Sequence, residues 1–156
     1  MTELVIRLAR DADSGQLVEL RRDLTFEELP PEESQVRPDY EHDFHAFLDD
    51  ALAGGRWQIW VAEVDERIVA HAFVALVDKV PRPVRENRRI AYLTNVYTRP
   101  AFRRQGIGTE LIRRVQEAAR EADVELMLVW PSDGSVELYE REGFTASNEP
   151  LVWEAS

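Results

Sequence analysis

The chain has 156 residues, of which 30 are acidic and 19 basic, giving a net charge of -11, and it contains no cysteine. This length suits one domain with a core large enough to fold alone. The lack of cysteine excludes a disulfide framework, a thiolate metal site and a cysteine nucleophile, and the acidity disfavours binding to nucleic acid, which requires a basic surface.

The first half of the chain predicts strands and two helices. Residues 1–10 mix acids with arginines and show no signal peptide, and no stretch approaches the roughly 20 apolar residues of a membrane span. We therefore expect a soluble, cytoplasmic protein without membrane contact. The predicted elements are a strand at 4–8, a helix capped by Asp11 or Asp13 that ends near Phe26, a helix at 38–55, and strands at 57–64 and 67–77 joined by a short hairpin.

Residues 79–89 predict an irregular loop that contains two prolines and five basic side chains, among them Lys79, Arg82 and Arg85. Hairpin connections usually need only two to five residues, and long ordered loops often bind ligands. Two interpretations stay open. The loop borders a site for a ligand with an anionic group, or it is a solvated loop that offsets the acidic surface.

The stretch from Arg99 to Arg114 is a basic island, with five arginines and one acid. Gly106 and Gly108 allow a ligand to approach the backbone closely, and the first amides of the helix that follows have no partner within that helix. Such a turn is typical of a phosphate-binding site.

The second half of the chain completes a mixed α/β pattern. Its predicted elements are a strand at 90–98 that ends at Arg99-Pro100, a helix at 106–122, a strand at 126–130 buried on both faces, a short helix at 135–142 that ends at Gly143, and a last strand at 151–154.

Three segments resemble one family. The spacing Arg103-x-x-Gly106-x-Gly108 fits neither the dinucleotide fingerprint nor the P-loop, but it resembles the pyrophosphate-binding motif of the GNAT superfamily of acyl-CoA-dependent N-acetyltransferases. The strand at 90–98 is similar to the family's central strand, with Thr98 in place of the usual valine at its exit. Leu-Tyr-x-x-x-Gly-Phe at 138–144 is similar to a second signature.

The resemblance covers roughly residues 55–145. It implies one domain over 1–156, with a three-layer α/β/α fold around a central, mostly antiparallel sheet. It further implies transfer of an acetyl group from acetyl-CoA to an amine by direct attack, with no metal and no covalent enzyme intermediate.

The resemblance also assigns the site residues. Tyr139 would donate a proton or a hydrogen bond to the CoA sulfur, although a tyrosine on a short helix can equally be a packing residue. Independently of the resemblance, Asn95 could orient the amine or a water molecule, or it could be an ordinary structural polar group. The residues expected to bind acetyl-CoA, several through the main chain, are Val96, Tyr97, Thr98, Arg103, Arg104, Gln105, Gly106, Ile107, Gly108, Thr109 and Ser132.

Several alternatives stay open. Ser132 could instead cap a helix, and the general base is unassigned: Glu63 and Glu125 could act through water or be ordinary surface groups. We expect His42, His45 and His71 to be surface or packed side chains. The chain could also be a noncatalytic acyl-CoA-binding or sensing module on the same fold. The sequence does not identify the amine acceptor, although the loop at 79–89 could border its site, and a homodimer is compatible with the resemblance.

Overall fold

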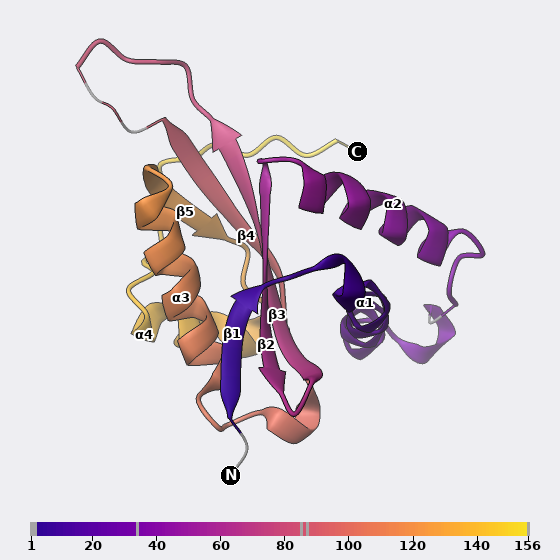
Figure 1. The fold of residues 1–156 in the computed structure, drawn as a ribbon. Coiled ribbons are helices and arrows are strands. Elements are labelled where there is room, and N and C mark those ends of the chain that lie inside the picture. Colours follow the sequence, from indigo (N-terminus) through magenta and orange to yellow (C-terminus); the bar gives the residue numbers. More distant parts are fainter. Residues whose placement is uncertain (1–2, 34, 85, 87, 156) are drawn as a thin grey trace.

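One five-stranded sheet forms the centre of the protein. The computed structural model describes residues 3–33, 35–84, 86 and 88–155. The strands lie in the order β1-β2-β3-β4-β5, and every pair is antiparallel except β4 and β5, which are parallel (Figure 1). Their bounds are β1 Leu4–Leu8, β2 Trp57–Val64, β3 Arg67–Asp78, β4 Arg89–Thr98 and β5 Val124–Val129.

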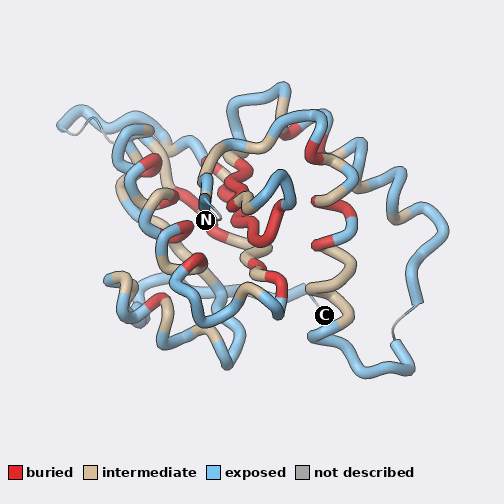
Figure 2. The backbone as a smooth tube through the Cα atoms, turned by 60° about the horizontal axis from the view of Figure 1, so that its bottom comes forward, coloured by how far each residue is buried: buried red, intermediate tan, exposed pale blue. Residues whose placement is uncertain are grey.

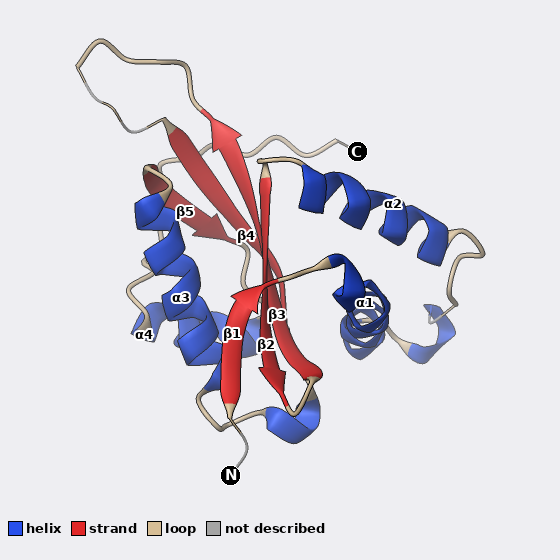
Figure 3. Cartoon of the chain, viewed as in Figure 1, coloured by secondary structure: helices blue, strands red, loops and turns tan. Residues whose placement is uncertain are grey.

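Helices cover both faces of this sheet. In Figure 3, α3 and α4 lie on one side, and α1 and α2 lie on the other. Their bounds are α1 Ser14–Glu28, α2 Tyr40–Ala53, α3 Ile107–Glu121 and α4 Val136–Arg141. This arrangement confirms the predicted three-layer α/β/α fold with a mostly antiparallel sheet. No helix in the described part of the chain combines the length and the apolar character that crossing a bilayer requires.

The core consists of two apolar clusters, one on each face of the sheet. The apolar stripe of α3, with Leu111, Ile112 and Val115 fully buried, packs against small and β-branched side chains of β3 and β4. On the other face, Leu17 and Leu20 of α1 join Leu48 of α2 over β2 and β3. Burying one such side chain contributes about 1.5–3 kcal/mol. Figure 2 shows the buried segments concentrated in the central strands.

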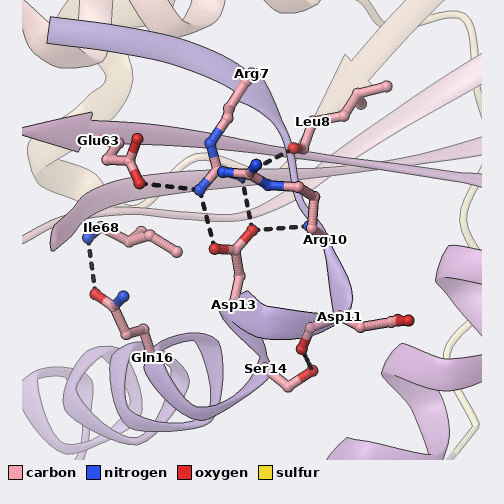
Figure 4. A network of polar contacts seen from close by, with 9 residues as sticks. All are labelled: Arg7, Leu8, Arg10, Asp11, Asp13, Ser14, Gln16, Glu63 and Ile68. Carbon is pink, nitrogen blue, oxygen red and sulfur yellow. Dashed lines mark hydrogen bonds and ion pairs between the residues drawn. The ribbon is translucent and has the colours of Figure 1, made fainter. Parts of the chain in front are cut away.

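A polar network fixes the start of α1 against β1 (Figure 4). Arg7 donates to both carboxylate oxygens of Asp13, at 2.7 and 2.9 Å, and to Glu63 at 3.1 Å. The hydrogen bond from Arg7 is the main reason that the pKa of Asp13 lies below its usual value. The Gln16 side-chain oxygen also accepts from the Ile68 amide at 2.8 Å. With its first turn held in this way, α1 places its later turns over β4.

Two sequence predictions are wrong in the second half of the chain. Residues 151–154 form no strand, and Leu151, Val152 and Trp153 are exposed. β5 is not buried on both faces, because Leu126 is 49% exposed. Within the described sheet β5 is an edge strand, and α3 packs against one of its faces.

Candidate functional site

A bulge interrupts β4 at Asn95. His71 and Phe73 of β3 pair with Tyr97 and Thr94 of β4, so two residues of β4 stand opposite one of β3. Asn95 takes φ = +51°, a left-handed conformation that asparagine tolerates better than most residues. The sequence itself gives no sign of the extra residue.

Beyond this bulge, β4 and β5 separate. Their pairing ends at Leu93 and Val129, so the last residues of β4 have no neighbour on that side among the described strands. The Arg99 amide donates to the Val69 carbonyl of β3 at 2.8 Å. Since successive residues of a strand direct their backbone groups to opposite sides, the Thr98 amide points toward the side that β5 has left, and so does that of Val96.

A cavity of about 580 Å³ occupies this gap. It brings together parts of the chain that are far apart in the sequence: α1, the end of β4, the start of α3 and the segment from the end of β5 to α4. Both predicted catalytic residues, Asn95 and Tyr139, line it. So do six of the predicted acetyl-CoA contacts, namely Val96, Tyr97, Thr98, Arg103, Gly108 and Ser132.

The turn before α3 forms the predicted amide cluster beside this cavity. Gly106 has φ = +79° and is the N-cap of α3, and Arg104 also has a positive φ of +60°. The Glu110 amide donates to the Gly106 carbonyl at 3.0 Å and closes the first turn. In the described part of the chain, no backbone or side-chain acceptor takes the amides of residues 106–109. Such amides, together with the positive end of the helix dipole, are the groups with which a helix N-terminus can bind an anion.

The other predicted acetyl-CoA contacts belong to the same turn but do not line the cavity. Arg104 and Gln105 are exposed, the side chain of Ile107 is buried in the core, and Thr109 is half-buried. Gly108 faces the cavity. A Cβ there would lie 3.8 Å from Leu138 and 3.9 Å from the Thr98 hydroxyl.

Arg103 connects the turn to α1. Its Nε donates to the Thr98 carbonyl at 2.9 Å, and its Nη2 donates to both oxygens of Glu27, at 3.0 and 2.8 Å. Tyr97 donates its hydroxyl to the same Glu27 carboxylate at 2.7 Å. Burial raises the pKa of Glu27, but the hydrogen bonds from Arg103 and Tyr97 outweigh this effect and leave the pKa below its usual value. Glu27 is therefore a charged carboxylate and a weak base at neutral pH.

Tyr139 lies on α4 with its ring 5.4 Å from that of Phe144, in an edge-to-face contact. Burial raises the pKa of its hydroxyl to about 12, so the group stays protonated at neutral pH. Among the described residues, none makes a hydrogen bond to this hydroxyl. A protonated hydroxyl in the cavity wall can donate to a ligand atom.

Asn95 joins two polar side chains at the bulge. Its side-chain oxygen accepts from Arg21 Nη1 at 2.9 Å, and its backbone carbonyl lies 2.6 Å from Nδ1 of His71. His71 is fully buried, as we expected of a packed histidine, and burial lowers its pKa to about 4. A carbonyl oxygen only accepts, so the neutral ring carries its proton on Nδ1. His42 and His45 are exposed, which confirms the other part of that expectation.

The structure places both suggested bases outside the cavity. Glu63 is bound by Arg7, and Glu125 forms ion pairs with Lys79 and Arg82 at the start of β5, the end opposite to Val129. The described part of the loop at 79–89 also lies at that far end of the sheet (Figure 1). Its described residues line neither this cavity nor the cavity between α1 and α2, which favours the interpretation as a solvated loop. Arg85 of this loop lies outside the described residues.

Ser132 lies between the cavity and a short helical turn, but its side chain does not cap that turn. It lines the cavity, and it occupies the N-cap of a single 3₁₀ turn at Asp133–Ser135. Its hydroxyl bonds to the Ser135 hydroxyl at 3.0 Å rather than to a backbone amide.

The contribution of α1 to the cavity was not predicted from the sequence. Arg21, Leu24, Glu27 and Glu28 line the cavity from this helix. Their spacing of three, four and seven residues places them on one face, which is the available signal. That face mixes charges with a leucine, so it did not stand out from an ordinary solvated surface.

The comparisons with known proteins agree with this geometry. The sequence profile of the acetyltransferase (GNAT) family matches residues 16–144. An N-acetyltransferase of Methanocaldococcus jannaschii that has not been characterised is 34% identical over 71 residues. That match spans 44% of this chain and 31% of the relative, so the aligned part is less than a third of that protein's length.

Solved structures share the fold over nearly the whole chain. A predicted acetyltransferase of Clostridium acetobutylicum, crystallised with acetyl-CoA, superimposes with a TM-score of 0.80 at 27% identity, covering 97% of this chain and 96% of that one. A GCN5-related N-acetyltransferase of Ralstonia eutropha has a TM-score of 0.78 at 20% identity, covering 99% and 100%. The second likeness shows the fold alone.

Proposed function

Because this chain belongs to the acetyltransferase (GNAT) family, we propose that it transfers an acetyl group from acetyl-CoA to a primary amine by direct attack, without a metal ion. The amine nitrogen attacks the thioester carbonyl carbon, and the C–S bond then breaks. The products are an amide and CoA with a free thiol. The amine loses one proton and the departing sulfur gains one.

One observation carries this proposal: the cavity where β4 separates from β5 reaches the amide cluster of α3 at Gly108. An anionic, extended ligand such as acetyl-CoA would place its pyrophosphate on the amides of residues 106–109 and its thioester along the free edge of β4. The crystal structure of the Clostridium acetobutylicum relative contains acetyl-CoA, which supports this class of ligand.

The free edge of β4 would stabilise the oxyanion. The Val96 and Thr98 amides point into the gap, and the bulge at Asn95 fixes their direction. A fixed donor aimed at the carbonyl oxygen stabilises the negative charge that develops there when the amine attacks. The side chains of these residues need take no part.

Tyr139 would donate a hydrogen bond to the departing thiolate, which then takes its proton from water. Its pKa of about 12 keeps the hydroxyl protonated at neutral pH. Because the thiol of CoA has a far lower pKa than this tyrosine, the hydroxyl keeps its proton and donates a hydrogen bond. This hydrogen bond strengthens as the sulfur becomes negative.

The amine would lose its proton to water. Glu27, bound by Arg103 and Tyr97, is a weak base, but its negative charge at the cavity wall favours the approach of an ammonium group. An amine with a pKa nearer to neutral is deprotonated more easily, so this site favours acceptors of that kind.

The experiment is a transfer assay with acetyl-CoA and a panel of amines. Release of free thiol is followed together with the mass of the acetylated product, with and without EDTA. We expect an acetylated product that depends on both substrates and is unaffected by EDTA. Tight binding of acetyl-CoA without transfer to any amine in a broad panel would instead support the noncatalytic acyl-CoA-binding module.

A further inference from the structure

A second cavity lies on the other side of Arg21 from the first. It has a volume of about 400 Å³ and lies between α1, α2 and the segment that joins them. Aromatic rings dominate its apolar lining, with Phe44 and Phe47 in contact at a ring distance of 6.2 Å. Its lining includes Phe26, Val36, Tyr40, Phe44 and Phe47. Arg21 lines both cavities, so it lies between them.

Arg21 differs from the other cations of the two cavities in having no acidic partner. Arg103 pairs with Glu27 at 2.8 Å, Arg22 with Glu41 at 2.8 Å, and Arg37 with Asp43 at 3.1 Å. Among the described residues, no carboxylate forms an ion pair with Arg21, and its only side-chain partner is the neutral amide oxygen of Asn95. A half-buried guanidinium has five N–H donors in a planar fork that fits a carboxylate.

We propose that the acceptor is a free α-amino acid with an aromatic side chain, whose carboxylate binds Arg21. This proposal rests on the proposed acetyl transfer and names the substrate class of that reaction. One carbon of such an acceptor carries an amine, a carboxylate and a side chain. Around Arg21 these groups meet three matching surroundings: the β4 gap, the guanidinium of Arg21 and the aromatic cavity.

The electrostatics of the site agree with this class. The lining of the first cavity contains two arginines, Arg21 and Arg103, and two carboxylates, Glu27 and Glu28, so its charge is balanced and suits a zwitterion, which is neutral overall. An α-amine also has a lower pKa than a lysine side chain. It therefore suits a site without a strong base.

The test compares three acceptors that share a phenyl ring and a primary amine. Phenylalanine has the carboxylate, phenylalaninamide replaces it by a neutral amide, and phenethylamine lacks it. A charge-assisted hydrogen-bonded pair corresponds to a difference of about 10- to 100-fold in kcat/KM. We expect phenylalanine to exceed both others by this factor, although the amine of the amide is the easier to deprotonate.

Arg21→Gln should remove this preference. The variant should lose about 10- to 100-fold in kcat/KM for phenylalanine, mainly through KM, and stay within about threefold of the parent for phenethylamine. Arg21→Lys, which keeps the charge without the fork, should restore part of the loss. Arg120→Gln is the matched control, because Arg120 is an exposed arginine of α3 that lines neither cavity. This variant should leave kcat/KM unchanged for both substrates.

A variant in the aromatic cavity tests whether this cavity binds the side chain of the acceptor. Phe26→Ala should raise KM for phenylalanine and leave KM for alanine unchanged, because alanine does not reach that cavity. Thermal melting of each variant shows whether it is folded.

The outcomes separate this inference from the proposed function. Equal use of the three acceptors by the parent protein overturns the carboxylate contact. An equal loss for all three in Arg21→Gln also overturns it, because Arg21 would then only support Asn95. Transfer to other amines but to none of these three overturns the amino-acid class and leaves acetyl transfer standing. Acetyl-CoA binding with no transfer to any amine means that the proposed function itself has failed.

Discussion

His71 shows how one buried side chain fixes the backbone at the candidate site. Its Nδ1–H donates to the Asn95 carbonyl at 2.6 Å, which holds the left-handed residue of the bulge in place. Its Nε2 is buried and has no hydrogen-bond partner among the described residues. The positive charges of Arg21 and Arg99 add to burial in disfavouring the protonated ring. Acid should therefore destabilise this part of the protein.

The first prediction concerns His71 and pH. Its pKa is about 4 in the folded protein and near 6.5 when unfolded, so the unfolded chain binds the extra proton first. Stability is then full above pH 6.5 and falls as pH drops toward 4, by about 3 kcal/mol from this group. Urea unfolding at pH 7 and pH 4 should show that the parent loses this much more than His71→Gln.

His45→Gln, which changes an exposed histidine of α2, should behave as the parent does. Parallel losses in the parent and in His71→Gln would mean that the buried ring already titrates near its ordinary pKa in the folded state.

The second prediction tests the hydroxyl of Tyr139. Tyr139→Phe keeps the ring against Phe144 and removes only the proton donor, so kcat should fall about 10²- to 10⁴-fold. The affinity for acetyl-CoA should change little. Tyr92→Phe is the matched control, because Tyr92 lies on β4 outside the cavity lining and should keep its rate. A rate within a few fold of the parent in Tyr139→Phe would make this residue a packing group.

Some site residues follow from the sequence and others do not. Gly106, Gly108 and Tyr139 belong to short patterns whose members are close in the chain, so their roles are accessible to a reading of the sequence. Arg21 and Glu27 reach the cavity only because α1 crosses β4, a contact between residues more than 60 positions apart. A pattern of local spacing contains no information on such a contact.

At the level of elements, the turn before α3 has a demanding backbone. Gly106 has φ = +79°, with open space around its missing Cβ, so the conformation and not crowding favours glycine there. The left-handed region costs an ordinary residue about 1–2 kcal/mol, and more for a β-branched one. The amides that follow depend on this conformation for their direction.

The third prediction is that Gly106→Val weakens acetyl-CoA binding while Gly106→Asn largely keeps it, because asparagine adopts the left-handed conformation more easily. Calorimetric titration gives the affinity, and melting without ligand shows the cost to the fold. Full affinity in the valine variant would show that the amides of residues 106–109 do not hold the pyrophosphate.

The fourth prediction concerns the role of the loop between β3 and β4. Arg82 pairs with Glu125 at 3.6 Å, at the end of the sheet far from the cavity. Arg82→Gln should therefore leave KM for both acetyl-CoA and the amine within about twofold, because exposed ion pairs contribute little. Steady-state kinetics decide this, and a rise in KM for the amine alone would return the loop to the acceptor site.

Most elements were predictable because their signals are local. The predicted boundaries agree with those of the structure to within about two residues for three features. These are the helix with the apolar stripe (α3), the two strands joined by the hairpin at Asp65 and Glu66, and the short helix that ends before Gly143. The prediction of a strand at 151–154 was wrong, because β-branched and aromatic residues form a strand only beside a partner strand. No described strand pairs with this segment. The prediction that β5 is buried on both faces was wrong, because the sequence of a strand does not show whether the strand lies in the middle or at the edge of the sheet.

At the scale of the whole molecule, the cavity connects layers that otherwise pack separately. Lining residues come from the helix layer of α1, from the sheet and from the layer of α3 and α4. A ligand that contacts all three layers binds only the folded protein. It should therefore stabilise the whole fold and not a single loop.

The fifth prediction follows from this arrangement. Acetyl-CoA at a hundredfold excess over Kd should add about 2.7 kcal/mol to the free energy of unfolding. For a chain of this size, the melting temperature should then rise by about 5–11 °C. Dephospho-CoA, which keeps the pyrophosphate, should give a similar shift, whereas ATP should give none. A shift with ATP of equal size would indicate a general nucleotide site.

The extra residue of β4 also determines which sequences can share this site. Before the bulge, Ala91 and Leu93 face the cluster under α3, and after it Tyr97 faces the opposite cluster, although all three positions are odd-numbered. Removing one residue at Asn95 would give a regular strand with Tyr97 still on its present side, whereas a regular strand without this deletion would turn Tyr97 away from Glu27. An alignment that places a one-residue gap here therefore pairs this chain with proteins whose strand is regular. Insertions and deletions at this position, more than substitutions, should separate relatives that keep the opening between β4 and β5 from those that have closed it.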